Sequence, residues 1–107
     1  MVDNRPSAIG LIQRNLLCGA ESGLVALAAR HGLRLAYTVE TDARPLVVGM
    51  ALVRHVAEFR AVAVVVPGFE HADPVRHVVT EVAALVTPMV WYPKGFRWPA
   101  PQVESGS

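Results

Sequence analysis

Glu70 and His71 are neighbours in the sequence, and their side chains could together carry out acid–base chemistry. They lie in the stretch Gly68–Ala72, directly after an unbroken apolar run over 61–66 that contains four valines. A carboxylate beside an imidazole can move a proton between reacting groups. No nucleophile stands near the pair in the sequence, and we therefore interpret it as a polar turn.

The other residue types that support chemistry are spaced unfavourably. The four histidines do not form a metal-binding spacing such as H-x-x-x-H, and Cys18 is the only cysteine. Neither the G-x-G-x-x-G fingerprint nor the G-x-x-x-x-G-K-[ST] loop of nucleotide-binding proteins occurs. We expect no metal, no cofactor and no standard nucleotide site. Cys18 is expected to be a small buried side chain rather than a reactive thiol.

Aromatic and cationic residues are interleaved near the C-terminal end of the chain. Such a mixture can stack single-stranded bases, but two cations are too few for an electrostatic groove. We expect the rings instead to pin the following segment onto the sheet edge or onto helix faces. The set consists of Trp91, Tyr92, Phe96 and Trp98, with Lys94 and Arg97 among them.

Composition restricts the class of protein further. A length of 107 residues favours one domain, and 52% hydrophobic with 18% charged residues favours a folded core over disorder. The net charge of +1 argues against strong nucleic-acid binding. A single cysteine fits a reducing cytoplasm. We see no signal peptide and no apolar run of the roughly 18 residues that a membrane span needs, so we expect a cytoplasmic protein.

The apolar patterns predict strands that alternate with helices. We expect strands at 8–12, 33–39, 61–66 and 89–92, and helices at 21–31, 46–59 and 74–86. This βαβαβαβ order is typical of a three-layer α/β sandwich with a mainly parallel, four-stranded sheet. Residues 1–92 would form the domain, with 1–7 as a flexible arm and 93–107 as an irregular tail. The run 61–66 should be a buried central strand, so the loop after it would lie where α/β proteins bind ligands.

The helix expected at 46–59 has more apolar residues than one face of a sheet requires. Four of them, Val48, Leu52, Val56 and Phe59, are expected to face the sheet. The remaining apolar residues would then be exposed together, and exposed apolar patches mark interfaces. We expect this interface to join two copies of the chain, or else to be covered by the tail. Its members are Leu46, Val47, Met50 and Val53, with Arg54 beside them.

Three segments carry a resemblance to a known family. They are Leu11-Ile12-Gln13-Arg14-Asn15-Leu16, Arg44-Pro45-Leu46 and Phe69-Glu70-His71-Ala72-Asp73-Pro74. In order and spacing they resemble the end of the first strand, the start of the second helix and the segment after the third strand of the serine recombinases, the resolvase and invertase family. The resemblance covers roughly 8–92 and implies a resolvase-like fold.

The resemblance also implies a catalytic site, and this chain departs from it. Asn15 stands where the family has the serine that attacks a DNA phosphate, and an amide has no ionisable hydroxyl to act as nucleophile. Gln13, His71 and Pro74 stand where the family places arginines that neutralise charge at phosphorus. With Glu70, these residues form a degenerate set of site positions, and we expect neither DNA-joining activity nor strong DNA binding.

Two functional hypotheses follow. The first is a catalytically inactive, resolvase-like module that binds another protein or itself. The second is a small enzyme, or a nucleotide- or nucleic-acid-binding domain, that uses the strand-end loops for a different chemistry. In that case Arg14, Asn15, Glu70 and His71 would supply the polar groups.

Overall fold

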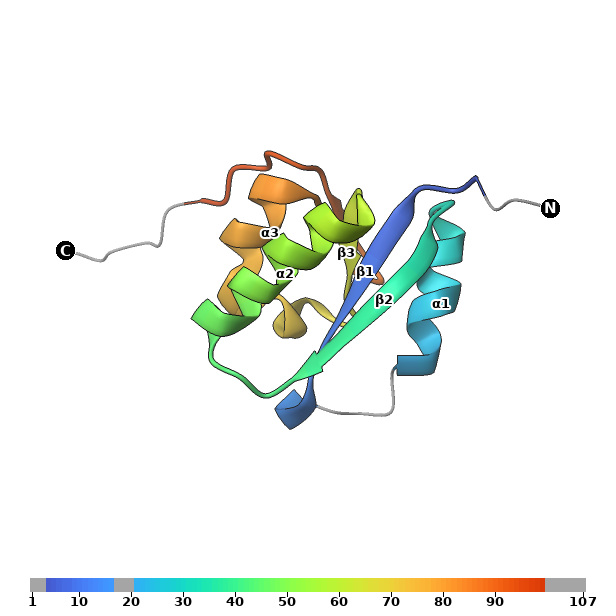
Figure 1. Cartoon of the computed structure of the whole chain (residues 1–107). Coiled ribbons are helices and arrows are strands. Elements are labelled where there is room, and N and C mark those ends of the chain that lie inside the picture. Colours follow the sequence, from blue (N-terminus) through green and yellow to red (C-terminus); the bar gives the residue numbers. More distant parts are fainter. Residues whose placement is uncertain (1–3, 17–20, 100–107) are drawn as a thin grey trace.

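The computed structural model describes residues 4–16 and 21–99, in which one mostly parallel sheet is flanked by helices (Figure 1). The sheet has the strand order β2-β1-β3-β4-β5, and only β5 runs antiparallel to its neighbour. The α/β class and the mainly parallel sheet are thus confirmed, with five strands rather than four. The strands are β1 (Ser7–Gln13), β2 (Arg34–Thr41), β3 (Ala63–Val65), β4 (Ala84–Val86) and β5 (Trp91–Tyr92).

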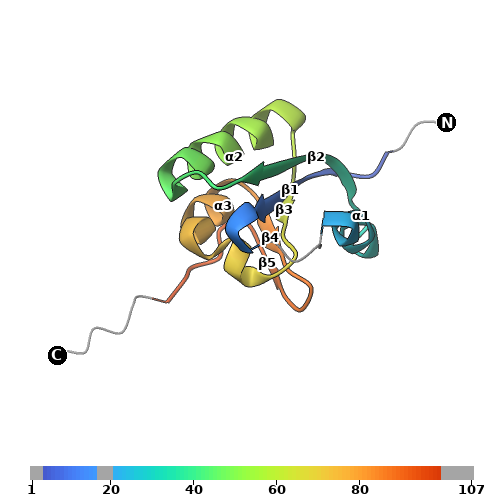
Figure 2. The ribbon, with the colours of Figure 1, turned by 90° about the horizontal axis from the view of Figure 1, so that it is seen from below.

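Helices cover both faces of the sheet. Viewed as in Figure 2, α2 (Pro45–Phe59) and α3 (Arg76–Val82) lie on one side and α1 (Glu21–Arg30) on the other. Alternate residues of the buried strands supply the two cores: Val64 packs toward α2 and α3, and Val65 toward α1. Short 3₁₀ turns link the elements at η1 (Arg14–Leu16), η2 (Phe69–His71) and η3 (Asp73–Val75). Within the described residues, no helix has the length and apolar character to cross a bilayer.

The third helix ends earlier than expected, an additional strand follows it, and the strand expected at 89–92 is shortened to Trp91–Tyr92. The helix ends at Val82, and Ala84–Val86 is instead a fully buried strand that pairs in parallel with β3. A short apolar run fits a buried strand as well as a helix, so the sequence pattern alone does not separate the two. Thr87 then turns the chain, because its hydroxyl accepts hydrogen bonds from the backbone N–H groups of Met89 and Val90. Only two residues, Trp91 and Tyr92, remain to form the antiparallel edge.

β1 lies beside the middle strand of the sheet and pairs with β2 on one side and β3 on the other. All seven of its residues are buried. The strand begins earlier than expected: the carbonyl of Pro6 accepts a hydrogen bond from Arg34 N–H, and the Arg34 guanidinium donates to Ser7 Oγ. Ser7, which was expected in a flexible arm, therefore belongs to β1, and Pro6 is held to β2 by its carbonyl. Residues 1–3 of that arm lie outside the described part.

An extra residue interrupts the regular alternation of sides along β2. Its register with β1 shifts between Ala8 and Ile9, which pair with Leu35 and Tyr37, so Ala36 is an extra residue. Leu35 consequently packs on the α1 side, while Val39 packs on the α2 side. The apolar residues of this strand therefore do not share one face, because one inserted residue reverses the side to which the following residues point.

Both α1 and α2 end in a left-handed residue. After α1 this residue is Gly32 (φ 71°), and the N–H groups of Gly32 and Leu33 donate to the carbonyls of Ala29 and Ala28. After α2 the same arrangement is made by Arg60 (φ 51°), a residue type with a steric cost in this conformation. α2 begins at Pro45, whose fixed φ suits the first helical position.

Candidate functional site

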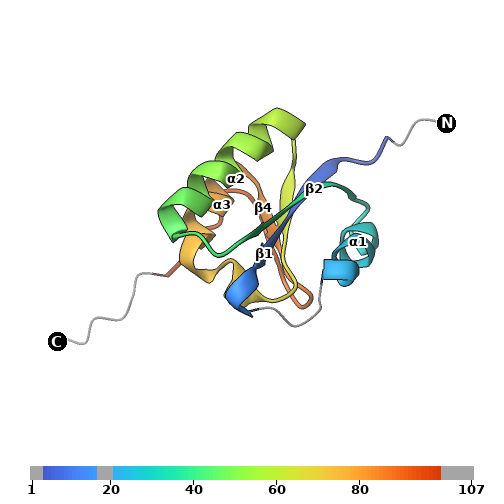
Figure 3. The ribbon, with the colours of Figure 1, turned by 60° about the horizontal axis from the view of Figure 1, so that its bottom comes forward.

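The site positions that the sequence resemblance indicated lie at or after the carboxyl ends of β1 and β3. The chain leaves β1 toward β2 and leaves β3 toward β4, so the strand order reverses between these two neighbours. In open α/β sheets, such a reversal separates the two following loops and leaves a crevice between them. Here η1 and η2 border that point, and both views from below show them side by side (Figures 2 and 3).

Gln13 and His71 are joined directly across this edge of the sheet. The backbone N–H of Gln13 donates to His71 Nδ1 at 2.9 Å, and Gln13 Nε2 donates to the His71 carbonyl at 3.4 Å. Both residues are buried, with exposed fractions of 7% and 1%. The structure therefore brings together two of the predicted positions that are far apart in sequence.

The hydrogen bond from Gln13 fixes the protonation of His71. Because Nδ1 accepts this bond, its lone pair is occupied and the ring proton resides on Nε2. Burial lowers the pKa of His71 below its ordinary value of 6.5, and the nearby Glu70 carboxylate offsets this only in part. The buried Nε2 has no hydrogen-bond partner among the described residues. His71 is thus a neutral imidazole whose basic nitrogen, Nδ1, already accepts a hydrogen bond from Gln13. Such a group is poorly suited to act as a general base.

A pocket of about 300 Å³ opens beside this pair. Two carboxylates line it, and none of its lining residues within the described chain is a cation. Such a pocket favours a positively charged group over a phosphate. Its lining residues are Gln13, Leu16, Asp42, Ala43, Pro45, Glu70 and Pro74.

Most of the predicted site positions are thus in one place. Gln13, Glu70 and Pro74 line the pocket, and His71 is bonded to Gln13 behind it. Asn15 lies in η1, while its side chain is outside the described part, as is Cys18. Asp42 was missed, although its position after β2 places it at the same edge of the sheet as the loops that follow β1 and β3. Among the described residues, no group of three or more potential ligand side chains could hold a metal ion.

The exposed side of α2 presents a second feature. Val48, Leu52 and Val56 are buried against the sheet, and Phe59 is half-buried beside them, as expected. Four other large apolar residues of the helix, here termed the α2 face, are exposed by 75%, 54%, 65% and 40%, respectively: Leu46, Val47, Met50 and Val53. An apolar hollow of about 390 Å³ adjoins them, lined by Pro45, Leu46, Gly49, Met50, Val53, Arg54 and Val78.

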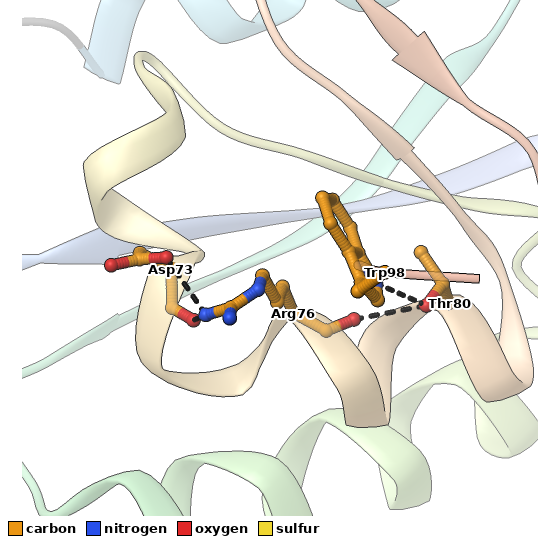
Figure 4. Close-up of polar contacts among 4 residues, drawn as sticks. All are labelled: Asp73, Arg76, Thr80 and Trp98. Carbon is orange, nitrogen blue, oxygen red and sulfur yellow. Dashed lines mark hydrogen bonds and ion pairs between the residues drawn. The ribbon is translucent and has the colours of Figure 1, made fainter. Parts of the chain in front are cut away.

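The aromatic residues near the C-terminal end divide between the two faces of the sheet. Tyr92, Phe96 and Trp98 pack together with Phe69 beside α3, where Trp98 Nε1 donates to Thr80 Oγ1 at 2.9 Å (Figure 4). They do pin the tail, as expected. Trp91 instead contacts His31 on the α1 side, so the four rings do not form one patch.

The described part of the tail also leaves the α2 face uncovered. Trp98 is held on α3 by Thr80 and by the Arg76 guanidinium, which lies 5.6 Å from the ring centre. Arg76 is itself held by Asp73 (Figure 4). The alternative in which Phe96 and Trp98 cover the α2 face is therefore wrong; residues 100–107 lie outside the described part.

We predict that Trp98 contributes more to stability than Trp91. Trp98→Ala should lower the free energy of unfolding by about 2–3 kcal/mol, because it removes a half-buried ring and leaves Thr80 without its donor. Trp91→Ala, the matched control at a 41% exposed position, should cost less than about 1 kcal/mol. Urea unfolding followed by circular dichroism measures both values. Equal losses would contradict the anchoring role of Trp98.

Comparison with known proteins found no matching family model, curated protein or solved structure. The function is therefore inferred from the site geometry and from the α2 face.

Proposed function

We propose that this chain is a resolvase-like α/β module without recombinase chemistry, and that it functions by binding a second copy of itself through the α2 face. The observation that carries this proposal is the exposure of four large apolar side chains on one helix, beside an apolar hollow. Contiguous apolar surface of this kind marks interaction sites on soluble proteins. Burying each such side chain favours association by about 1.5–3 kcal/mol before the costs of binding are subtracted.

The geometry of the strand-end site supports a non-catalytic role. Recombinase chemistry needs a nucleophile and a cationic clamp, and the pocket offers carboxylates from Asp42 and Glu70 instead. The same features weaken the alternative of a different enzyme at this edge. His71, the natural acid–base candidate, is buried with its basic nitrogen bonded to Gln13.

The test is the mass of the protein in solution. Met50→Lys places a charge in the middle of the α2 face and should convert a dimer into a monomer with an unchanged circular dichroism spectrum. The measurement is size-exclusion chromatography with light scattering at high micromolar concentration.

Met89→Lys is the matched control for this experiment. Met89 is the more exposed of the two methionines, at 89%, but it lies in the turn between β4 and β5, away from α2. This variant should remain dimeric. A monomeric wild-type chain at the same concentration would refute self-association, and equal dissociation of both variants would remove the α2 face from the interface.

A further inference from the structure

The two ends of the α2 face carry opposite charges. Arg54 lines the apolar hollow toward the C-terminal end of the helix. At the other end, the strand-end pocket holds the carboxylates of Asp42 and Glu70. Pro45 lines both hollows, so the acidic pocket directly adjoins the apolar one. The linings of the two hollows therefore place an apolar centre between a cation at one end and two anions at the other, and Arg44, the exposed N-cap residue of α2, lies outside the pocket lining beside the anionic end.

Within the ranges 4–16 and 21–99, these charged groups have no ion-pair partner. An intrahelical pair between Arg54 and Glu58 is expected from their spacing, yet Glu58 lies 3.4 Å from the imidazole of His55 instead. Among the residues that the structure describes, Arg54 forms no ion pair, and neither do Asp42 and Glu70. A guanidinium and two carboxylates are thus available to a partner.

A two-fold axis matches this charge distribution to itself. In a symmetric dimer, each copy offers the same patch, so every contact occurs twice. If the two α2 helices run antiparallel and cross near Met50, Arg54 of one copy lies opposite Leu46 of the other, since each is about 6 Å along the helix from Met50. The long arginine side chain then points toward the partner's acidic pocket, beyond Pro45. A parallel arrangement would instead bring like charges together.

We propose that two copies of this chain pack through antiparallel α2 helices, each with Arg54 inserted into the strand-end pocket of the other. This inference rests on the proposed function and specifies its geometry. Inside the pocket the guanidinium meets Asp42 and Glu70, and the Gln13 amide oxygen supplies a further acceptor. The planar, five-donor guanidinium suits several acceptors at once, which an ammonium group does not.

Charge exchange tests the arrangement. Arg54→Glu alone puts one glutamate against the two carboxylates of each acidic pocket, and Asp42→Lys with Glu70→Lys puts each Arg54 against two lysines. Each variant alone should dimerise at least about tenfold more weakly than the wild type, as expected for disrupting a partly buried charge pair. When the two variants are mixed, both contacts of the mixed dimer again join opposite charges. The mixture should therefore form heterodimers, detected by native mass spectrometry.

The outcomes separate this inference from the proposed function. Arg30→Glu, an exposed change on α1 at the opposite face of the sheet, is the charge control and should remain dimeric. If Met50→Lys dissociates the dimer while Arg54→Glu does not, the α2 face remains the interface and the antiparallel register is wrong. A mixture of the two exchanged variants that stays monomeric also overturns the register. A wild-type monomer refutes both proposals.

Discussion

Leu52→Ala is expected to lower the free energy of unfolding by about 2–5 kcal/mol, far more than the truncation of any exposed residue on the same helix. Leu52 has no exposed surface. Its side chain lies on the side of α2 that faces the sheet and belongs to the same core cluster as buried residues of β1 and β3. Truncating it leaves a cavity that a close-packed core fills only in part, so both transfer energy and packing contacts are lost. Urea denaturation followed by circular dichroism measures the difference.

Leu46→Ala is the control for this change, because it is the same substitution on the same helix. Leu46 is 75% exposed, and its truncation should change the free energy of unfolding by no more than about 0.5 kcal/mol. Both variants are best compared in a Met50→Lys background, so that self-association does not contribute. Similar losses of unfolding free energy at the two positions would mean that α2 is rotated differently about its axis. The residues of the α2 face would then not be the exposed ones.

The stability of the protein is expected to fall as the pH drops below about 6.5, because His71 has a lowered pKa in the folded state. Burial disfavours the charged imidazole, whereas the unfolded chain protonates near the ordinary value of 6.5. Protons therefore bind the unfolded state more readily between the two pKa values. The stabilisation is fully present above pH 6.5 and is lost toward the folded-state pKa, by at most about 1.4 kcal/mol per pH unit.

His71→Asn should flatten this dependence. The asparagine side-chain oxygen can take the place of Nδ1 as acceptor for the Gln13 N–H, but it does not titrate. The exposed His77 serves as the control, and His77→Asn should leave the slope between pH 5 and pH 6.5, values chosen around the ordinary histidine pKa, unchanged. Chemical denaturation at a series of pH values provides the data. A slope that persists in His71→Asn would assign the dependence to another group.

Several features of the fold could be predicted because local pattern and tertiary context agree. Pro45 and the apolar periodicity that follows it define α2, and Gly32 marks the end of α1. The segment 84–86 could not be assigned in the same way, because its strand character comes from pairing with β3 rather than from its own pattern. The extra residue in β2 likewise leaves no mark in the sequence, since it depends on the register with β1.

The candidate site likewise has features that could be predicted from the sequence and features that could not. Parallel strands bring their carboxyl ends to one edge, so the proximity of Gln13 and Glu70 follows from the predicted topology. The burial of His71 does not follow, because a histidine in a polar turn is more often solvated. Asp42 was overlooked because the predicted site included only the loops after β1 and β3, whereas the loop after β2 reaches the same pocket.

The position of β1 between β2 and β3 also determines how the chain can fold. β1, α1 and β2 follow one another in sequence, so their contacts close comparatively short loops. The pairing of β1 with β3, such as Ile9 with Val64, requires α2 to be traversed first. That closure costs chain entropy before the central hydrogen bonds form, and such non-local parallel pairing slows folding. β1 is synthesised before both of its partner strands, so its hydrogen bonding is completed only once β3 has been added to the chain.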